Sequence, residues 1–99
     1  DFFCKELKLN AEYSKTTNEL VITNNGNVPV KGWQIKKESA GSVEIQNDDN
    51  GLSTGNSMTI IIIGSPDKIK IVPILRGKTK NGEFQDKICE DDAFEPNTI

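Results

Sequence analysis

Apolar residues alternate with polar ones along most of this chain, in short runs that turn-forming residues interrupt. The run at 7–13 (LKLNAEY) is the clearest case, since every second residue in it is apolar. A period of two residues is that of a β-strand with one buried face. No window shows the 3.6-residue period over the length that a helix needs. The alternation therefore predicts an all-β fold.

Further runs of the same kind follow at 20–23, 28–36, 43–45, 57–63, 69–74 and 84–88. Turn signals separate them, of which 24–27 (NNGN) is the strongest, because Asn-Gly tolerates the positive φ of tight turns. About seven short strands with a turn every eight to twelve residues are typical of a sandwich or a barrel. We predict a sandwich of about seven mainly antiparallel strands.

Three segments fall outside this regular pattern. The polar stretch 47–56, which only Leu52 interrupts, is predicted to be the longest loop, and 76–82 is predicted to be a hairpin loop. Residues 90–99 are acidic and aperiodic, so we expect a domain at 1–89 and a flexible tail at 90–99.

The two cysteines of the chain stand near its ends, just outside the first and last strand patterns. In a cytosolic protein such a pair would more often be two unrelated buried thiols. The ends of a compact domain often meet, however, and a bridge closing so long a loop stabilises a small domain by roughly 4–5 kcal/mol. We therefore predict a Cys4–Cys89 disulfide and, from it, an extracellular or cell-surface location. An exported protein would carry a leader or membrane anchor upstream of Asp1.

Composition argues against several classes of function. Ninety-nine residues make one domain, and a net charge of −3 without a basic stripe argues against nucleic acid as a partner. The sequence contains no histidine, which removes the commonest general base and metal ligand. We expect a non-enzymatic domain without a cofactor.

Two groups of residues suggest a ligand and also have a simpler explanation. Asp48 and Asn50 ahead of Gly51 resemble part of a calcium loop, but the distal glutamate is missing and an Asp/Asn/Gly turn needs no metal. They are weak metal candidates, and we predict no metal site. Tyr13 and Trp33 could stack on a sugar, yet each is in the inward phase of its strand, so we predict that both are core residues.

Contacts with a partner are expected at aromatic ends and at one strand. Phe2, Phe3 and Phe94 lie outside the strand patterns, where they could pack on a missing segment or partner. The four isoleucines at 60–63 suggest either burial on both faces of a strand or an edge that pairs with something. The predicted interaction residues are Phe2, Phe3, Ile61 and Ile63.

Several segments together resemble the head domains of archaeal type IV pilin-like and related surface proteins: 2–7 (FFCKEL), 20–30 (LVITNNGNVPV), 67–75 (DKIKIVPIL) and Cys89. The turn at 23–27 (TNNGN) is also similar to turns of CARDB-like surface modules. The resemblance implies an immunoglobulin-like (Ig-like) β-sandwich. A pilin also carries an apolar helix behind a class III signal peptide, so that helix would lie upstream, or else the likeness covers the head alone.

These observations lead to two hypotheses of function. The first is a structural head domain of a filament or envelope protein, whose partners are protein subunits of the same assembly and which meets a membrane only through an upstream anchor. The alternative is an extracellular binding module for carbohydrate or for calcium-assisted adhesion, using 47–56 and 76–82. An enzyme such as a small glycosidase is the least favoured reading.

Overall fold

The computed structural model describes residues 3–99, and its regular secondary structure is almost entirely β-strand. The strands are β1 (Leu9–Ser14), β2 (Glu19–Asn24), β3 (Gly32–Ser39), β4 (Ser42–Asp48), β5 (Ser57–Ile61), β6 (Lys68–Lys78), β7 (Phe84–Ile88) and β8 (Asn97–Thr98). Two single-turn 3₁₀ helices, η1 (Cys4–Glu6) and η2 (Glu90–Asp92), flank them. Within residues 3–99, no helix has the length and apolar character needed to cross a membrane.

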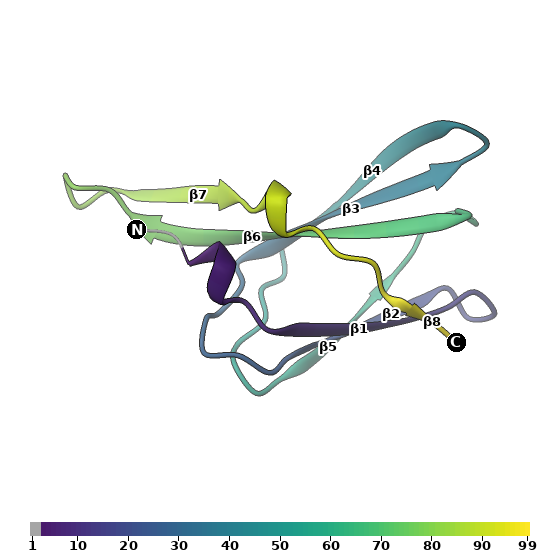
Figure 1. Ribbon diagram of the computed structural model, residues 1–99, viewed down its shortest axis with the longest axis horizontal. Helices are drawn as coiled ribbons and strands as arrows, with labels where there is room; N and C mark the ends of the chain where they lie inside the picture. Colours follow the sequence, from purple (N-terminus) through teal and green to yellow (C-terminus); the bar gives the residue numbers. More distant parts are fainter. Residues whose placement is uncertain (1–2) are drawn as a thin grey trace.

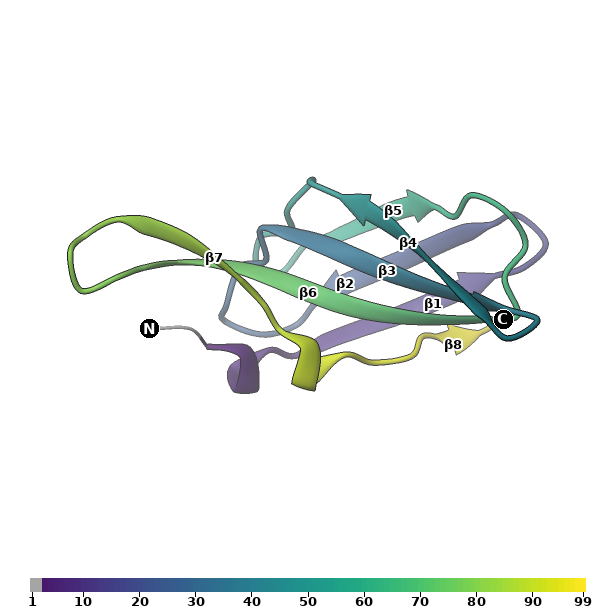
Figure 2. The ribbon, with the colours of Figure 1, turned by 90° about the horizontal axis from the view of Figure 1, so that it is seen from above.

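The strands form two stacked sheets, with strand orders β5-β2-β1-β8 and β4-β3-β6-β7. Figure 1 shows the two layers in side view, and Figure 2 shows them from above. All neighbouring pairs are antiparallel except β1 and β8. The predicted all-β sandwich of mainly antiparallel strands is confirmed.

The core fills the space between the sheets and is lined by alternate residues of the central strands. Trp33, Ile35 and Ile71 come from one sheet and Leu20 and Ile22 from the other, and all five are fully buried. Ile35 lies directly opposite Ile71 in the β3–β6 register, as period-two burial requires. The prediction that Tyr13 and Trp33 belong to the core is confirmed, since both are buried.

The two predicted loops differ from expectation. The segment 47–56 is anchored, because Leu52 is buried and forms an isolated bridge with Val30, and Asn24 Nδ2 donates to the Leu52 carbonyl at 3.3 Å. The predicted hairpin loop at 76–82 is wrong at its start, because β6 continues to Lys78 and pairs there with Phe84. The sequence did not indicate that β6 extends to Lys78, because Arg76 and Lys78 make this part of the strand resemble a polar loop.

Residues 90–99, which were expected to form a flexible tail, contact both sheets. Ile71 and Phe94 exchange two backbone hydrogen bonds of 2.7 and 3.0 Å, so Phe94 packs half-buried on the core. Farther on, Thr98 lies in parallel register with Tyr13 of β1. No pattern in the sequence indicates this docking, because a two-residue strand is too short to show alternation.

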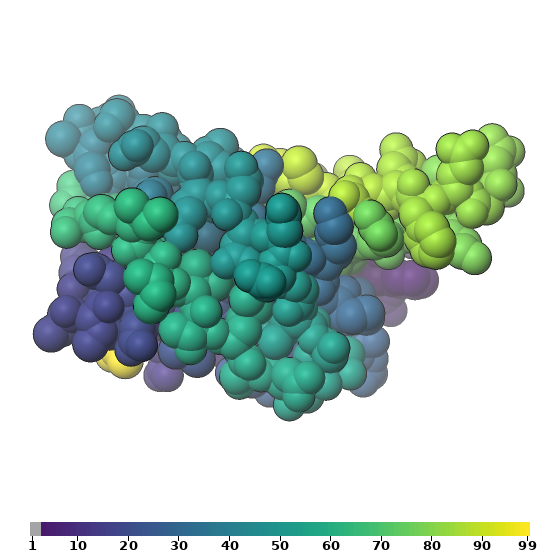
Figure 3. Space-filling view, turned by 180° about the vertical axis from the view of Figure 1, so that it is seen from behind, coloured from purple at the N-terminus to yellow at the C-terminus, as the bar shows by residue number. Residues whose placement is uncertain are grey.

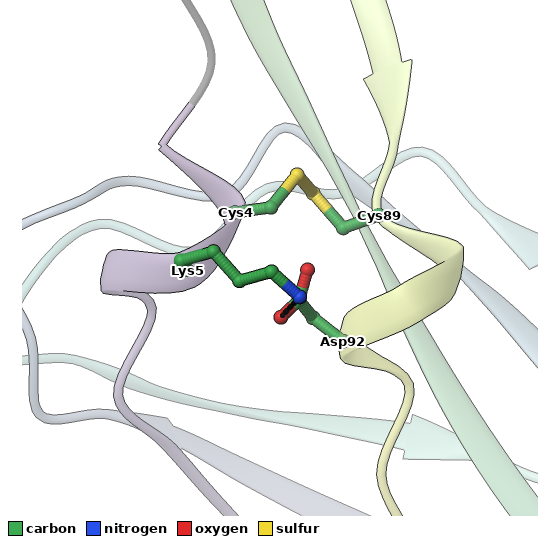
Figure 4. The surroundings of a disulfide bond; sticks show 4 residues. All are labelled: Cys4, Lys5, Cys89 and Asp92. Atoms are coloured by element: carbon green, nitrogen blue, oxygen red, sulfur yellow. Dashed lines mark ion pairs between the residues drawn. A yellow bond between two sulfur atoms is a disulfide. The ribbon is translucent and has the colours of Figure 1, made fainter.

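The ends of the chain meet at the predicted disulfide, which is confirmed. Cys4 and Cys89 are bonded, with a Cα–Cα distance of 5.7 Å across 85 positions of sequence. Next to the bridge, Lys5 Nζ of η1 lies 3.1 Å from Asp92 Oδ1 of η2 (Figure 4). The ion pair is solvent-exposed on its lysine side and adds little. The covalent bond is therefore what holds the two 3₁₀ helices together.

Reduction of the disulfide is expected to lower the melting temperature by well over about 5 °C, because the bridge removes roughly 4–5 kcal/mol of unfolded-state chain entropy. Thermal unfolding with and without reductant measures the shift. The double variant Cys4→Ser/Cys89→Ser should melt at the lower temperature under both conditions. Two freely alkylated thiols in the native protein would contradict the bridge.

Candidate interaction surfaces

The acidic turn that resembled a calcium loop is held together by its own hydrogen bonds. Asp48 Oδ1 accepts from the Asn50 N–H at 2.8 Å, and the Asn50 carbonyl accepts from Trp33 Nε1 at 3.1 Å. Gly51 lies so close to the segment before β3 that an added Cβ would stand 2.6 Å from the Val30 carbonyl oxygen. Asp48 and Asn50 thus shape the turn and fix the core tryptophan, a role that needs no ion.

Among residues 3–99, one group of three side chains has the spacing of metal ligands, namely Cys4, Cys89 and Asp92. Both sulfur atoms belong to the disulfide. A disulfide sulfur is not the thiolate that metal ions bind. This group therefore offers one carboxylate beside a covalent bridge.

The isoleucine run is buried on one face only. Ile60 and Ile62 point into the core, whereas Ile61 and Ile63 are 57% and 71% exposed. Burial on both faces, one of the two expectations, is therefore wrong. β5 is the edge strand of its sheet, as the other expectation requires.

Gln46 of β4 joins this edge to the other sheet. Its Nε2 donates to the Ile61 carbonyl at 2.8 Å, and its Oε1 accepts from the Ile63 N–H at 3.0 Å. A primary amide used in this way takes the place of a peptide group in a neighbouring strand. Lys37 Nζ adds a bond of 2.8 Å to the Ile63 carbonyl. These hydrogen bonds join the two sheets along the side where β4 and β5 lie.

The same side carries two exposed aliphatic residues that the sequence analysis did not single out. Val43 and Ile45 of β4 are 56% and 53% exposed. Ile35 of β3 points inward opposite Gln46, so the odd-numbered residues of β4 point outward. We define the aliphatic border as Val43, Ile45, Ile61 and Ile63. Figure 3 shows β4 and the β5 region together on one face.

The remaining predicted interaction residues lie elsewhere. Phe2 is outside the described residues. Phe3 is half-exposed beside η1 and lines a groove with Val28, Leu75 and Phe84, at the base of the β6–β7 hairpin. The structure therefore does not bring Phe3 together with Ile61 and Ile63.

The β6–β7 hairpin projects beyond the sandwich at the opposite end from the β3–β4 turn (Figures 1 and 2). Phe84 is 65% exposed, and its ring centroid lies 5.2 Å from Lys78 Nζ and 5.8 Å from the Arg76 guanidinium carbon. Both distances are within cation–π range. An apolar ring between two cations is thus presented to solvent.

Asp86 anchors the base of this hairpin. Its carboxylate accepts from Lys31 Nζ at 2.7 Å and from Arg76 Nε at 3.3 Å. The Lys31 hydrogen bond is the main cause that lowers the pKa of Asp86, with Arg76 contributing and desolvation opposing. A lowered pKa means that these contacts stabilise the hairpin above the ordinary carboxyl pKa and are lost as pH falls through the lowered value.

Calcium at millimolar concentration is expected to leave the melting temperature unchanged, because the groups of the 48–50 turn are already bonded internally. A site filled at a hundred times its dissociation constant would add about 2.7 kcal/mol. Thermal unfolding with calcium and with chelator makes the comparison. A rise of several degrees that Asp48→Ala abolishes would show that the turn does bind the ion.

Comparison with known proteins was made at the level of sequence and of fold. No family model, no curated protein and no solved structure matches this chain. Its function is therefore inferred from the surfaces described above.

Proposed function

We propose that this chain is a non-catalytic interaction domain displayed outside the cytosol, the solvent-facing head of a filament or envelope subunit of the archaeal type IV pilin-like kind. The aliphatic border carries the proposal. It places four β-branched side chains in solvent on a domain that has a complete core without them. Val43 and Ile45 point outward from one sheet and Ile61 from the other, along two edge strands that lie side by side. Exposed apolar side chains along such edges favour contact with another protein.

The disulfide supports the location. Structural disulfides form and persist in oxidising compartments and are rare in the cytosol of most organisms. The Cys4–Cys89 bond closes nearly the whole chain into one loop, so it acts on the stability of the entire domain. Such a bond suits a small head exposed to an extracellular environment.

The geometry of the border also supports recognition by surface contact. Ile61 and Ile63 stand beside backbone groups that Gln46 and Lys37 already bind, so a partner would reach their side chains without unmaking those bonds. Covering exposed apolar surface contributes about 25 cal/mol per Å². Covering several β-branched side chains at once would therefore contribute to assembly.

Ile61→Lys is expected to reduce assembly of filaments or envelope particles in cells that produce the full-length protein, while the isolated domain keeps its melting temperature within about 2 °C. The side chain is more than half exposed, so a lysine there meets water. Electron microscopy of sheared surface material and thermal unfolding are the two measurements.

Ile60→Lys is the matched control. Ile60 is its neighbour in sequence but is 3% exposed, so a lysine there should unfold the domain. Wild-type assembly by the folded Ile61→Lys variant would remove this part of the border from the proposed interface. Reduced cysteines and a cytosolic location in the source cells would refute display.

The β6–β7 hairpin favours a second candidate function, the binding of an acidic polysaccharide. Phe84 offers an apolar face between Arg76 and Lys78, an arrangement that suits a sugar ring carrying a carboxylate. The whole protein has a net charge of −3, so the cations of this hairpin stand out against an acidic background.

Polygalacturonate, a uronic acid polymer, is the probe for this second function. Binding measured by affinity electrophoresis should fall at least about 5-fold in Phe84→Ala and in Lys78→Gln, which corresponds to a loss of about 1 kcal/mol of binding free energy. Lys15→Gln, in the β1–β2 turn, is the charge-matched control and should bind normally. Equal binding by all three variants would argue against the hairpin as the site.

A further inference from the structure

The sandwich has four edge strands, and three of them have features that limit pairing with another chain. β8 has only two residues, and β5 is covered near its end by the Gln46 amide. β7 is short and carries a charged pair, Asp86 and Lys87. Short edges, charges and covering groups are the usual means by which proteins block edge-to-edge pairing.

β4 also carries charges, Glu44 and Asp48, but it is the longest of the four edge strands. It is seven residues long and pairs with β3 in an unbroken register, from Ser42 opposite Ser39 to Asp48 opposite Trp33. It contains no proline and no lysine. A long, regular and partly apolar edge strand is a template for a further strand.

The β3–β4 turn decides which main-chain groups of β4 are available. Its two central residues, Ala40 and Gly41, have φ values of 48° and 82°, and the strand pair next to it is Ser39 with Ser42. In a two-residue hairpin that first pair is hydrogen-bonded, and hydrogen-bonded pairs then alternate. The N–H and C=O groups of the odd-numbered residues Val43, Ile45 and Asn47 therefore point away from β3, toward the open edge.

We propose that a second copy of this chain pairs through β4 in antiparallel orientation, with the two-fold axis at Ile45. Ile45 then faces Ile45 of the second copy, and Val43 faces Asn47 of the second copy. These pairs use the three residues whose main-chain groups point outward. The sheets that contain β4 in the two copies become one continuous sheet, and the two Ile45 side chains become cross-strand neighbours on its outer face.

Main-chain direction and charge both disfavour an axis at the residues next to Ile45. The main-chain groups of Glu44 and Gln46 already bond to β3. An axis at Glu44 would also set two glutamates directly opposite each other, and an axis at Gln46 would set Glu44 opposite Asp48 of the second copy. Like charges directly opposite destabilise a strand pair. With the axis at Ile45, Glu44 faces the uncharged Gln46 of the second copy.

The same register brings opposite charges together. Gln46 Oε1 accepts from Lys37 Nζ at 3.2 Å, so an ammonium group stands beside the position that Glu44 of the second copy would take. The two-fold axis repeats this contact on the other side. Self-complementary charge is the reason to expect a second copy, since an unrelated strand would have to supply the same pattern independently.

One strand pair buries less surface than the 1,200–2,000 Å² of a standard stable interface, so the dimer is weak in free solution. Display on one surface or filament would hold copies close together and raise their effective concentration. Only this increase in effective concentration depends on the proposed function. The pairing itself is a property of the isolated chain.

Replacing Ile45 by residues of opposite charge in two separate variants tests the register. Sedimentation equilibrium of the wild-type chain up to about 1 mM should show a reversible dimer. Ile45→Lys and Ile45→Glu should each be monomeric, because each places like charges across the axis. An equimolar mixture of the two variants should associate again, and added salt should weaken that association. Rescue on mixing requires that position 45 lies close to position 45 of the other copy.

Proline variants separate loss of pairing from loss of folding. Ile45→Pro removes an N–H that points to the open edge, so it should abolish the dimer with only a small change in melting temperature. Glu44→Pro removes a bond of the β3–β4 ladder and should lower the melting temperature clearly. The melting temperature of each position-45 variant confirms that it is folded.

A wild-type chain that stays monomeric at the highest concentration overturns the inference. A dimer that survives both Ile45→Lys and Ile45→Pro overturns it as well. If the chain is monomeric and filament assembly still depends on Ile61, β4 pairing is refuted and the display role stands. If the dimer forms as expected while the cysteines are reduced in the cell, the display role fails and the pairing stands.

Discussion

The burial of Trp33 is the constraint on which the rest of this sandwich depends. The indole lies fully buried between the sheets, and its Nε1 donates to the Asn50 carbonyl at 3.1 Å and to Met58 Sδ at 3.2 Å. A buried indole N–H needs such partners. Trp33 thereby ties β3 to the 47–56 loop and to β5. The course of that loop decides where the edge strand of the second sheet lies.

With β5 in that place, Gln46 can reach across from β4 and bind the Ile61 and Ile63 main chain. The same contact gives the two neighbouring edges different properties. β5 loses main-chain groups that could have paired with another strand, while β4 uses only a side chain to bind it and keeps its own outward groups. One edge is therefore closed and the adjacent one stays open, although both carry exposed β-branched residues.

The two candidate surfaces lie at different parts of an elongated molecule, with extents of 45 × 28 × 19 Å. The β6–β7 hairpin projects from one end, and β3 and β4 run toward the turn at the other (Figure 1). Association through the aliphatic border would therefore leave the cationic hairpin accessible. The disulfide lies between η1 and η2 (Figure 4), close to the base of the hairpin, so it stabilises the end from which the hairpin projects.

Much of the fold could be predicted from the sequence, because the period-two alternation within each segment indicates which face of that strand is apolar. That pattern predicted the all-β sandwich and the burial of Tyr13 and Trp33, and the position of two cysteines at the chain ends predicted their bond. These properties follow from each segment's own composition, and from the tendency of domain ends to meet.

Tertiary structure alone decided which apolar residues of the alternating runs point into the core. Ile45 and Ile60 both occur in alternating or apolar runs, yet Ile45 is exposed and Ile60 is buried, because strand register places Ile45 on the outer face of one sheet and Ile60 on the inner face of the other. The docking of Phe94 and Thr98 likewise depends on backbone groups left free by distant strands. Strand pairing joins residues far apart in sequence, so the open edge at β4, the Gln46 contact and the ordered C-terminal segment depended on an arrangement that no local pattern encodes.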